Sequence, residues 1–233
     1  MKCTKIILER VQTWFNHFNQ LLGSPPKISN EDTPILTVFD SLGIPVDPFT
    51  PEEYQHVKKL IRCGKACGED GITPELLKFG GLDDIVLGFV NQAYEGEGIP
   101  EKWKTLIIVT VPKKGDLSKP DNYRGISLIC IIAKIYNRLI LNRIRGVIDL
   151  KLRINQNGFR SSRTTVAQIL ALRRVIEGVK ANNLKAILTF IDFRKAFDSI
   201  HRAKIMRLLK AYGIPPNLLQ GIEKCIQTPR PGL

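Results

Sequence analysis

Apolar residues recur at helical spacing along most of the chain, which predicts a protein built mainly from amphipathic helices. The first apolar stripe, in residues 4–22, ends at Gly23 with two prolines close behind it, a typical helix stop. Pro51, with two glutamates behind it, predicts the start of another helix, and residues 24–50 between them are expected to be a linker. The predicted helices cover residues 4–22, 51–62, 82–95, 128–148, 165–179 and 199–212, and a shorter helix ends near residue 227.

Two other patterns predict strands. Residues 105–114 alternate apolar and β-branched side chains, and residues 121–128 return after a turn, so a β-hairpin is expected there. Residues 186–191 form a continuous apolar run that ends abruptly at Asp192, as in a buried strand of a parallel or mixed sheet. Helices and strands together indicate an α/β (α+β) fold.

Composition limits the class of protein. At 233 residues and 43% hydrophobic, the chain can bury one or two modest cores, but it has no uninterrupted apolar segment long enough to span a bilayer. The first ten residues carry charge where a secretion signal needs an apolar centre, so we expect an intracellular protein with no membrane partner. Five irregularly spaced cysteines indicate reduced thiols. Cys63, Cys67 and His56 are spaced as zinc ligands could be, but no second Cys/His pair accompanies them.

Positive charge is concentrated in the second half of the chain. Residues 1–120 hold 14 Lys and Arg against 16 Asp and Glu, a net of −2, whereas residues 121–233 hold 21 against 6, a net of +15. This excess predicts a polyanion partner, held chiefly through its phosphates because only 7% of the residues are aromatic. On the predicted helix over residues 128–148, however, we interpret Lys134, Arg138 and Arg145 as a solvated face.

Asp192 is the candidate catalytic residue. Ligands sit beyond the carboxyl ends of buried strands, which makes this carboxylate a candidate metal ligand, although an acid at a strand end is more often a turn cap. We interpret Asp198 as the N-cap of the helix that follows. A nuclease-like pair of Asp192 and Asp198 is a weaker option, because no further acidic cluster or histidine accompanies the two residues.

Four motifs, in order along the chain, carry a family resemblance. They are GKACGEDGI (64–72), DNYRGISL (121–128), QNGFRSSRTT (156–165) and FIDFRKAFD (190–198). From about residue 63 to about residue 212 the chain resembles reverse transcriptases, especially those of non-LTR retrotransposons. The first motif departs from the usual proline-rich form at Cys67 and Glu69. A phosphate-binding P-loop is excluded there because Ala66 follows Lys65, where Ser or Thr is needed.

The resemblance implies a partial right-hand polymerase, with helix-rich fingers that include the β-hairpin and an incomplete palm sheet. We expect an upstream helix and linker over residues 1–50, a helical N-terminal extension over 51–100, and the fingers and first part of the palm over 101–233. The Tyr/Phe-Ala-Asp-Asp turn that supplies further metal carboxylates in the family does not occur in this sequence. The expected function is therefore that of a truncated RNA-directed DNA polymerase, inactive by itself. The alternative is a non-catalytic basic RNA- or DNA-binding protein derived from such an enzyme.

The resemblance also assigns roles to single residues. Asp192, with the Phe193 carbonyl beside it, would bind the two catalytic Mg²⁺ ions that activate the primer 3′-hydroxyl and steady the triphosphate. Lys113 and Arg124 would bind that triphosphate, and Phe197 would exclude a 2′-hydroxyl by its shape. Without the family, Lys113 and Arg124 are an ordinary basic turn, and Phe197 is equally well a core residue at the start of a helix.

The segment over residues 156–165 looks like the template-contacting segment of the family. Arg160 and Arg163 would meet the RNA backbone beside Gln156, and Gly158 would let the main chain come close. The implied partners are an RNA template, a DNA primer and deoxynucleoside triphosphates, with the oligomeric state left open. An intact element of this kind is expected to act in the nucleus.

Overall fold

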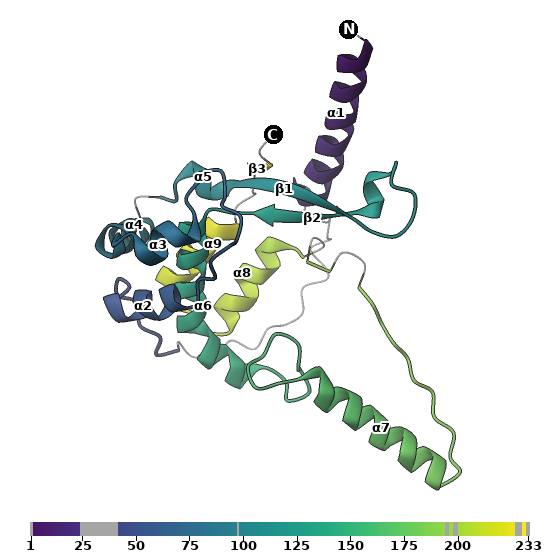
Figure 1. Cartoon of the computed structure of the whole chain (residues 1–233). Coiled ribbons are helices and arrows are strands. Elements are labelled where there is room, and N and C mark those ends of the chain that lie inside the picture. The colour runs from purple at the N-terminus through teal and green to yellow at the C-terminus, as the bar shows by residue number, and fades with distance from the viewer. Residues whose placement is uncertain are drawn as a thin grey trace.

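The structure is a computed structural model that describes residues 2–23, 42–96, 98–193, 196–197, 200–226 and 230–231 (Figure 1). Most of the expected linker and Asp198 lie outside the described residues. No helix in these ranges is both long enough and apolar enough to cross a membrane. The helices are α1 (Lys2–Gly23), α2 (Pro51–Lys59), α3 (Pro74–Phe79), α4 (Asp83–Glu95), α5 (Glu101–Lys104), α6 (Ile131–Lys151), α7 (Thr165–Ala181), α8 (Arg202–Ala211) and α9 (Pro216–Ile226), and the strands are β1 (Thr105–Pro112), β2 (Tyr123–Leu128) and β3 (Arg230–Pro231).

Helix α6 is the centre of the hydrophobic core. Helices α2, α4 and α9 pack around it and contribute, among others, Val57, Val90 and Leu218. Burying one such side chain contributes about 1.5–3 kcal/mol, so packing on α6 holds these helices more strongly than their own propensity does. The buried residues of α6 recur every three or four positions, as an amphipathic helix requires: Ile131, Ile132, Ile135, Tyr136, Leu139, Ile140 and Ile144.

The start of α2 follows from its sequence. Thr50 caps the helix by accepting the Glu53 N–H, the Glu53 carboxylate accepts the Thr50 N–H at 2.9 Å, and Pro51 occupies the first turn. This reciprocal pair is the capping box, which satisfies two backbone donors that the helix cannot pair internally. The predicted helix is confirmed, although it ends at Lys59, three residues before the predicted end.

The other predicted helices are also present. The structure confirms α1, α4, α6, α7, α8 and α9 with ends that differ by a few residues from the prediction. The N-cap position of α8 is held by His201, so the prediction that Asp198 caps this helix is wrong. Thr164 caps α7 by accepting the Ala167 N–H at 3.3 Å, as expected from the paired threonines. Helix α6 begins at Ile131 rather than at residue 128, because Leu128 still belongs to a strand. The short helices α3 and α5 were not predicted, since four to six residues are too few to show a helical period.

The predicted hairpin is confirmed. Strands β1 and β2 pair antiparallel, with Ile107 opposite Leu128 at one end and Pro112 opposite Tyr123 at the other. Strand β3 adds to the other edge of β1 in parallel, which gives the sheet order β2-β1-β3 among the described residues.

The strand predicted over residues 186–191 is wrong. Residues 184–193 have no regular structure, and the run is exposed to solvent, with Ile187 at 94% and Phe190 at 80% exposure. In Figure 1 this segment returns as a single extended chain from the far end of α7, a helix that itself extends away from the core and has no buried residue. A strand is completed by a neighbour that accepts and donates its backbone hydrogen bonds, and no described segment pairs with this one. The described strands therefore do not include the expected palm sheet.

Candidate nucleotide and nucleic-acid site

The hairpin places Lys113 and Arg124 on one face. Arg124 lies opposite Val111 in the strand register, and the ladder continues past the strands because the Lys113 N–H donates to the Asn122 carbonyl at 2.7 Å. Side chains two positions apart share a face, so Lys113 and Arg124 are diagonal neighbours at a typical Cα separation of about 7–8 Å. Both side chains are exposed to solvent. A single anion in front of this face can contact both cations.

Helix α1 covers the opposite face of the hairpin. The Trp14 ring meets Tyr123 edge to face, with ring centroids 4.4 Å apart. The Phe18 ring lies over Gly125, where an added Cβ would come within 2.7 Å of the Phe18 Cε1 atom. Tyr123 and Gly125 alternate with Arg124 along β2, so α1 closes one face and leaves the basic face open.

The turn between the strands is held by its own hydrogen bonds. The Ser118 hydroxyl and N–H donate to the Asp116 carboxylate at 2.7 and 2.9 Å, and these bonds hold the pKa of Asp116 below its ordinary value. The Asn122 side chain donates to the Asp116 carbonyl at 2.7 Å. The Lys113 ammonium donates to the Asp121 carbonyl over a long 3.3 Å, a bond that a phosphate oxygen can readily replace.

Asp192 and Phe193 lie on the exposed segment that follows α7. Both residues are exposed, so the carboxylate is not at the end of a buried strand as the sequence predicts. Phe197 is also exposed, at 71%, rather than packed in the core. Its ring contacts Phe159 in a T-shaped arrangement with centroids 5.8 Å apart. This contact brings the predicted sugar-selecting side chain next to the predicted template segment.

The residues described here do not by themselves form a magnesium site. Mg²⁺ requires near-octahedral coordination by oxygen, and Asp192 with the Phe193 carbonyl can supply only part of that set. Within the described ranges, no group of three or more His, Cys, Asp or Glu side chains could hold a metal ion. Within the described ranges, the fit of a divalent metal ion therefore rests on the Asp192 carboxylate and the Phe193 carbonyl.

Arg160 has a structural role in the predicted template segment. Its Nε and Nη2 atoms bind the two carboxylate oxygens of Asp149 at 2.7 and 3.0 Å, and its Nη1 atom donates to the carbonyls of Arg153 and Gln156. The side chain is only 8% exposed, and the guanidinium holds the pKa of Asp149 below its ordinary value. These bonds tie the loop after α6 back onto the last turns of that helix. The Arg160 guanidinium is thus bound to Asp149 of α6 and to loop carbonyls.

The other three residues of the template segment remain accessible. Arg163 is exposed and forms no ion pair with a described carboxylate. The Gln156 amide makes a long 3.4 Å bond to the Gly158 carbonyl, and a Cβ added at Gly158 would meet the Gln156 Nε2 atom at 3.8 Å, an ordinary contact. The strained backbone lies next to this glycine rather than on it, since Phe159 and Ser162 have φ angles of 62° and 59°.

Sequence reasoning missed Asp149 and Phe159. Asp149 is the partner that fixes Arg160, and Phe159 is the ring that meets Phe197. The sequence contains only a weak signal for Asp149. It is one of six acidic residues in residues 121–233, which also hold 21 Lys and Arg, so an acid there has many possible partners. Phe159 could have been noticed as a large apolar side chain between Gly158 and Arg160 in a polar loop.

Comparisons with known proteins identify the family of the chain. Residues 111–231 match the family described as reverse transcriptase (RNA-dependent DNA polymerase). The chain is 27% identical to the probable RNA-directed DNA polymerase from transposon BS of Drosophila melanogaster, over 88% of this chain and 23% of that protein. It is 27% identical to the RNA-directed DNA polymerase from mobile element jockey of the same species, over 94% of this chain and 25% of that protein.

A third relative comes from another species. The chain is 26% identical to the retrovirus-related Pol polyprotein from the type-1 retrotransposable element R2 of Popillia japonica, over 72% of this chain and 23% of that protein. The chain thus spans about a quarter or less of the length of the curated relatives it matches. Because the family match covers more than half of the chain, and because these relatives come from non-LTR elements, the chain belongs to the reverse transcriptase family, in its non-LTR retrotransposon branch.

Proposed function

We propose that this chain provides the fingers and the first acidic motif of the palm of an RNA-directed DNA polymerase that copies RNA by adding deoxynucleotides to a primer 3′-hydroxyl. The observation that carries the proposal is the hairpin, which presents Lys113 and Arg124 on one open face while α1 covers the other. A guanidinium and an ammonium side by side suit the triphosphate of a nucleotide, since the guanidinium can bind two phosphate oxygens at once.

The remaining roles extend this proposal. Phe197 lies under the incoming sugar and excludes a 2′-hydroxyl, supported by its exposure and its contact with Phe159. Arg163 is the arginine of the template segment that meets the RNA backbone. Arg160, whose donors bind Asp149 and nearby carbonyls, positions that segment instead of contacting the template.

Asp192 is proposed as one ligand of the divalent metal ions that the family uses. When bound, two Mg²⁺ ions supply the charge that activates a 3′-hydroxyl and stabilises a triphosphate. Losing a core metal ligand removes most of the activity of such a site, and this sequence has no Ala-Asp-Asp turn. The 233-residue chain assayed alone is therefore expected not to extend a primer.

The proposal is tested by nucleotide binding and by primer extension. Binding of a fluorescent deoxynucleoside triphosphate should weaken about tenfold in Lys113→Gln and in Arg124→Gln, the loss expected for one charge-assisted bond. Lys180→Gln and Arg174→Gln, which remove the same charges from exposed positions on α7, should bind as tightly as the wild type. If the hairpin variants bind the nucleotide as well as these controls do, the proposal is wrong.

Primer extension on a poly(rA) template tests whether the 233-residue chain can synthesise DNA by itself. No extension is expected from the chain alone. Extension that disappears in Asp192→Asn would overturn the inactivity proposal and support Asp192 as a metal ligand.

A second candidate is a non-catalytic RNA- or DNA-binding protein. It is favoured by the net charge of +15 over residues 121–233, combined with a single candidate metal ligand in the described ranges. Steeply salt-dependent RNA binding without any nucleotide binding at the hairpin would support this function over the first one.

A further inference from the structure

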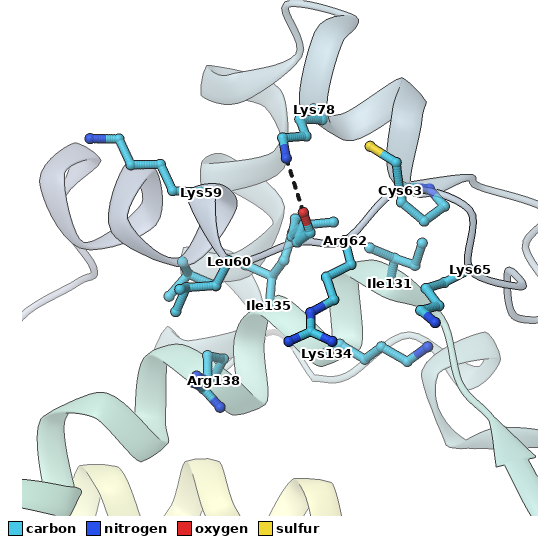
Figure 2. A pocket seen from close by; sticks show the side chains of 13 residues that line it. Lys59, Leu60, Arg62, Cys63, Lys65, Lys78, Ile131, Lys134, Ile135 and Arg138 are labelled. Carbon is cyan, nitrogen blue, oxygen red and sulfur yellow. Dashed lines mark hydrogen bonds between the residues drawn. The ribbon is translucent and has the colours of Figure 1, made fainter. Parts of the chain in front are cut away.

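A pocket of about 910 Å³ lies where α2 meets the first half of α6 (Figure 2). Its apolar lining includes Leu60, Ile131 and Ile135. No aspartate or glutamate lines it. The cations that line this pocket, named the basic pocket below, are Lys59, Arg62, Lys65, Lys78, Lys134 and Arg138.

The fold builds the basic pocket from two parts of the chain that are far apart in sequence, residues 57–78 and 131–138. Helix α2 ends at Lys59, and the loop that follows carries Arg62 and Lys65 over the start of α6. On α6, Lys134 and Arg138 are four residues apart and so share one side of the helix. Figure 2 shows Arg62, Lys65 and Lys134 beside the first turns of α6, with the end of Lys59 directed away from them.

The loop is fixed in place before any ligand arrives. The Lys78 ammonium donates to the Ile61 carbonyl at 3.1 Å, and the Gly64 N–H donates to the Glu75 carboxylate at 2.6 Å. Gly64 has a φ of 69°, which a side chain there would strain. The two bonds hold the loop on both sides of Arg62, so a ligand would lose little free energy to ordering the site.

Charge in the basic pocket is not balanced by acids. Some cations elsewhere are paired, as are Lys58 with Asp83 and Arg143 with Glu53. By contrast, Arg62, Lys65, Lys134 and Arg138 form no ion pair with a carboxylate in the part of the chain that the structure describes. Like charges gathered around a concave surface repel one another and focus the field on whatever enters it. A bound anion removes that repulsion.

We propose that the basic pocket binds the phosphate backbone of a single-stranded nucleic acid. The cations are distributed around a pocket near the upper end of the roughly 300–1,000 Å³ range of small-molecule sites, which is too large for a single phosphate. A flexible single strand can place its phosphates against the cations of a concave site. Its sugars and the faces of its bases can then contact Leu60, Ile131 and Ile135. The site deepens the proposed function and rests on it, since a polymerase that copies RNA must hold a single strand. It uses neither the hairpin nor Asp192, so its test can fail while nucleotide binding at the hairpin still holds.

The test compares two variants of the full chain that each lose four positive charges. One variant changes Arg62, Lys65, Lys134 and Arg138 to Gln. The matched control changes the exposed Arg173, Arg174, Lys180 and Lys185 to Gln. Binding of a fluorescein-labelled oligouridylate is measured by anisotropy at a series of KCl concentrations.

The pocket variant should bind at least ~10-fold more weakly, and the slope of log Kd against log salt should fall by about 2–3, since each phosphate contact with a single strand contributes about 0.7. The control should change the slope by less than about 1. Equal losses in the two variants would overturn the proposal, because they would show that only total charge matters. Loss of tripolyphosphate binding in the pocket variant, with oligouridylate binding unchanged, would also overturn it in favour of a free polyphosphate ligand.

A second measurement needs no substitution and so does not depend on how the variants fold. Lysines of the wild-type chain are acetylated with and without oligouridylate and quantified by mass spectrometry. Lys65 and Lys134 should be protected, whereas Lys180 and Lys185 should react as they do in the free protein. Protection that is absent from Lys65 and Lys134, or equal at all four lysines, would refute the proposal.

Discussion

Arg143 should be among the most costly single side chains to remove, because it joins α6 both to α2 and to the segment before α2. Its Nε and Nη2 atoms bind both carboxylate oxygens of Glu53 at 2.7 Å, and Nη1 donates to the Asp47 carbonyl at 2.6 Å. The guanidinium also lies 4.3 Å from the centre of the Phe49 ring, and the side chain is only 4% exposed. Removing one partner of a buried pair costs about 3–5 kcal/mol. Since Glu53 is 31% exposed, we expect a loss of about 3 kcal/mol in the free energy of unfolding for Arg143→Met.

The assay is urea unfolding followed by circular dichroism, with Arg145→Met as the matched control. Arg145 is exposed on the same helix, so its change should stay within about 0.5 kcal/mol. A loss below about 1 kcal/mol in Arg143→Met, or an equal loss in both variants, would refute the reasoning.

The contribution of this pair should also depend on pH. Burial raises the pKa of Glu53, but the hydrogen bonds from Arg143 and from the Thr50 N–H outweigh it and leave the pKa below its ordinary value. A carboxylate with a lowered pKa stabilises the fold above its unfolded pKa of about 4.3, and that contribution is lost as the pH falls through the lower folded value. The difference in stability between the wild type and Arg143→Met should therefore be full at neutral pH and shrink below about pH 4.

Three further substitutions test other parts of the structure. Gly125→Ala should displace α1 from the hairpin, because the new Cβ would lie 2.7 Å from Phe18 Cε1, and tryptophan fluorescence should shift to the red. Arg160→Gln should speed amide hydrogen exchange several-fold in the loop after α6, by releasing Asp149, while leaving exchange in α4 unchanged. Asp192→Asn should change the free energy of unfolding by less than about 0.5 kcal/mol, since the side chain is exposed, and a larger loss in urea unfolding would show that Asp192 is buried.

Elements with local signals could be predicted from the sequence. Thr50, Pro51 and Glu53 indicate the start of α2 within four residues, and Thr164 indicates the start of α7. The hairpin was predictable because alternation on both sides of a turn needs no partner beyond the hairpin itself. In each case the interacting groups are close in sequence, so the pattern contains the whole interaction.

The partners of Arg160 and the members of the basic pocket could not be predicted in this way. Arg160 looks like a solvent-exposed cation in a polar loop, and only the return of that loop to Asp149 shows that its donors are occupied. Lys65 belongs to a half of the chain with a net charge of −2, so the charge count gives no reason to group it with Lys134 and Arg138. Such groups form when the core folds, because packing on α6 decides which distant residues meet.

Asp192 and Arg143 show what sequence and structure each contribute to assigning a role. The five acceptors around Arg143 define its role without reference to any family, because a buried guanidinium must be paired and its partners are visible. Asp192 is the opposite case, since its surroundings are solvent and its assignment comes from FIDFRKAFD. Geometry in the structure and resemblance to a family are independent grounds for assigning a role. The roles proposed for Lys113 and Arg124 are the stronger for having both, a family motif and a register that puts the two cations on one face.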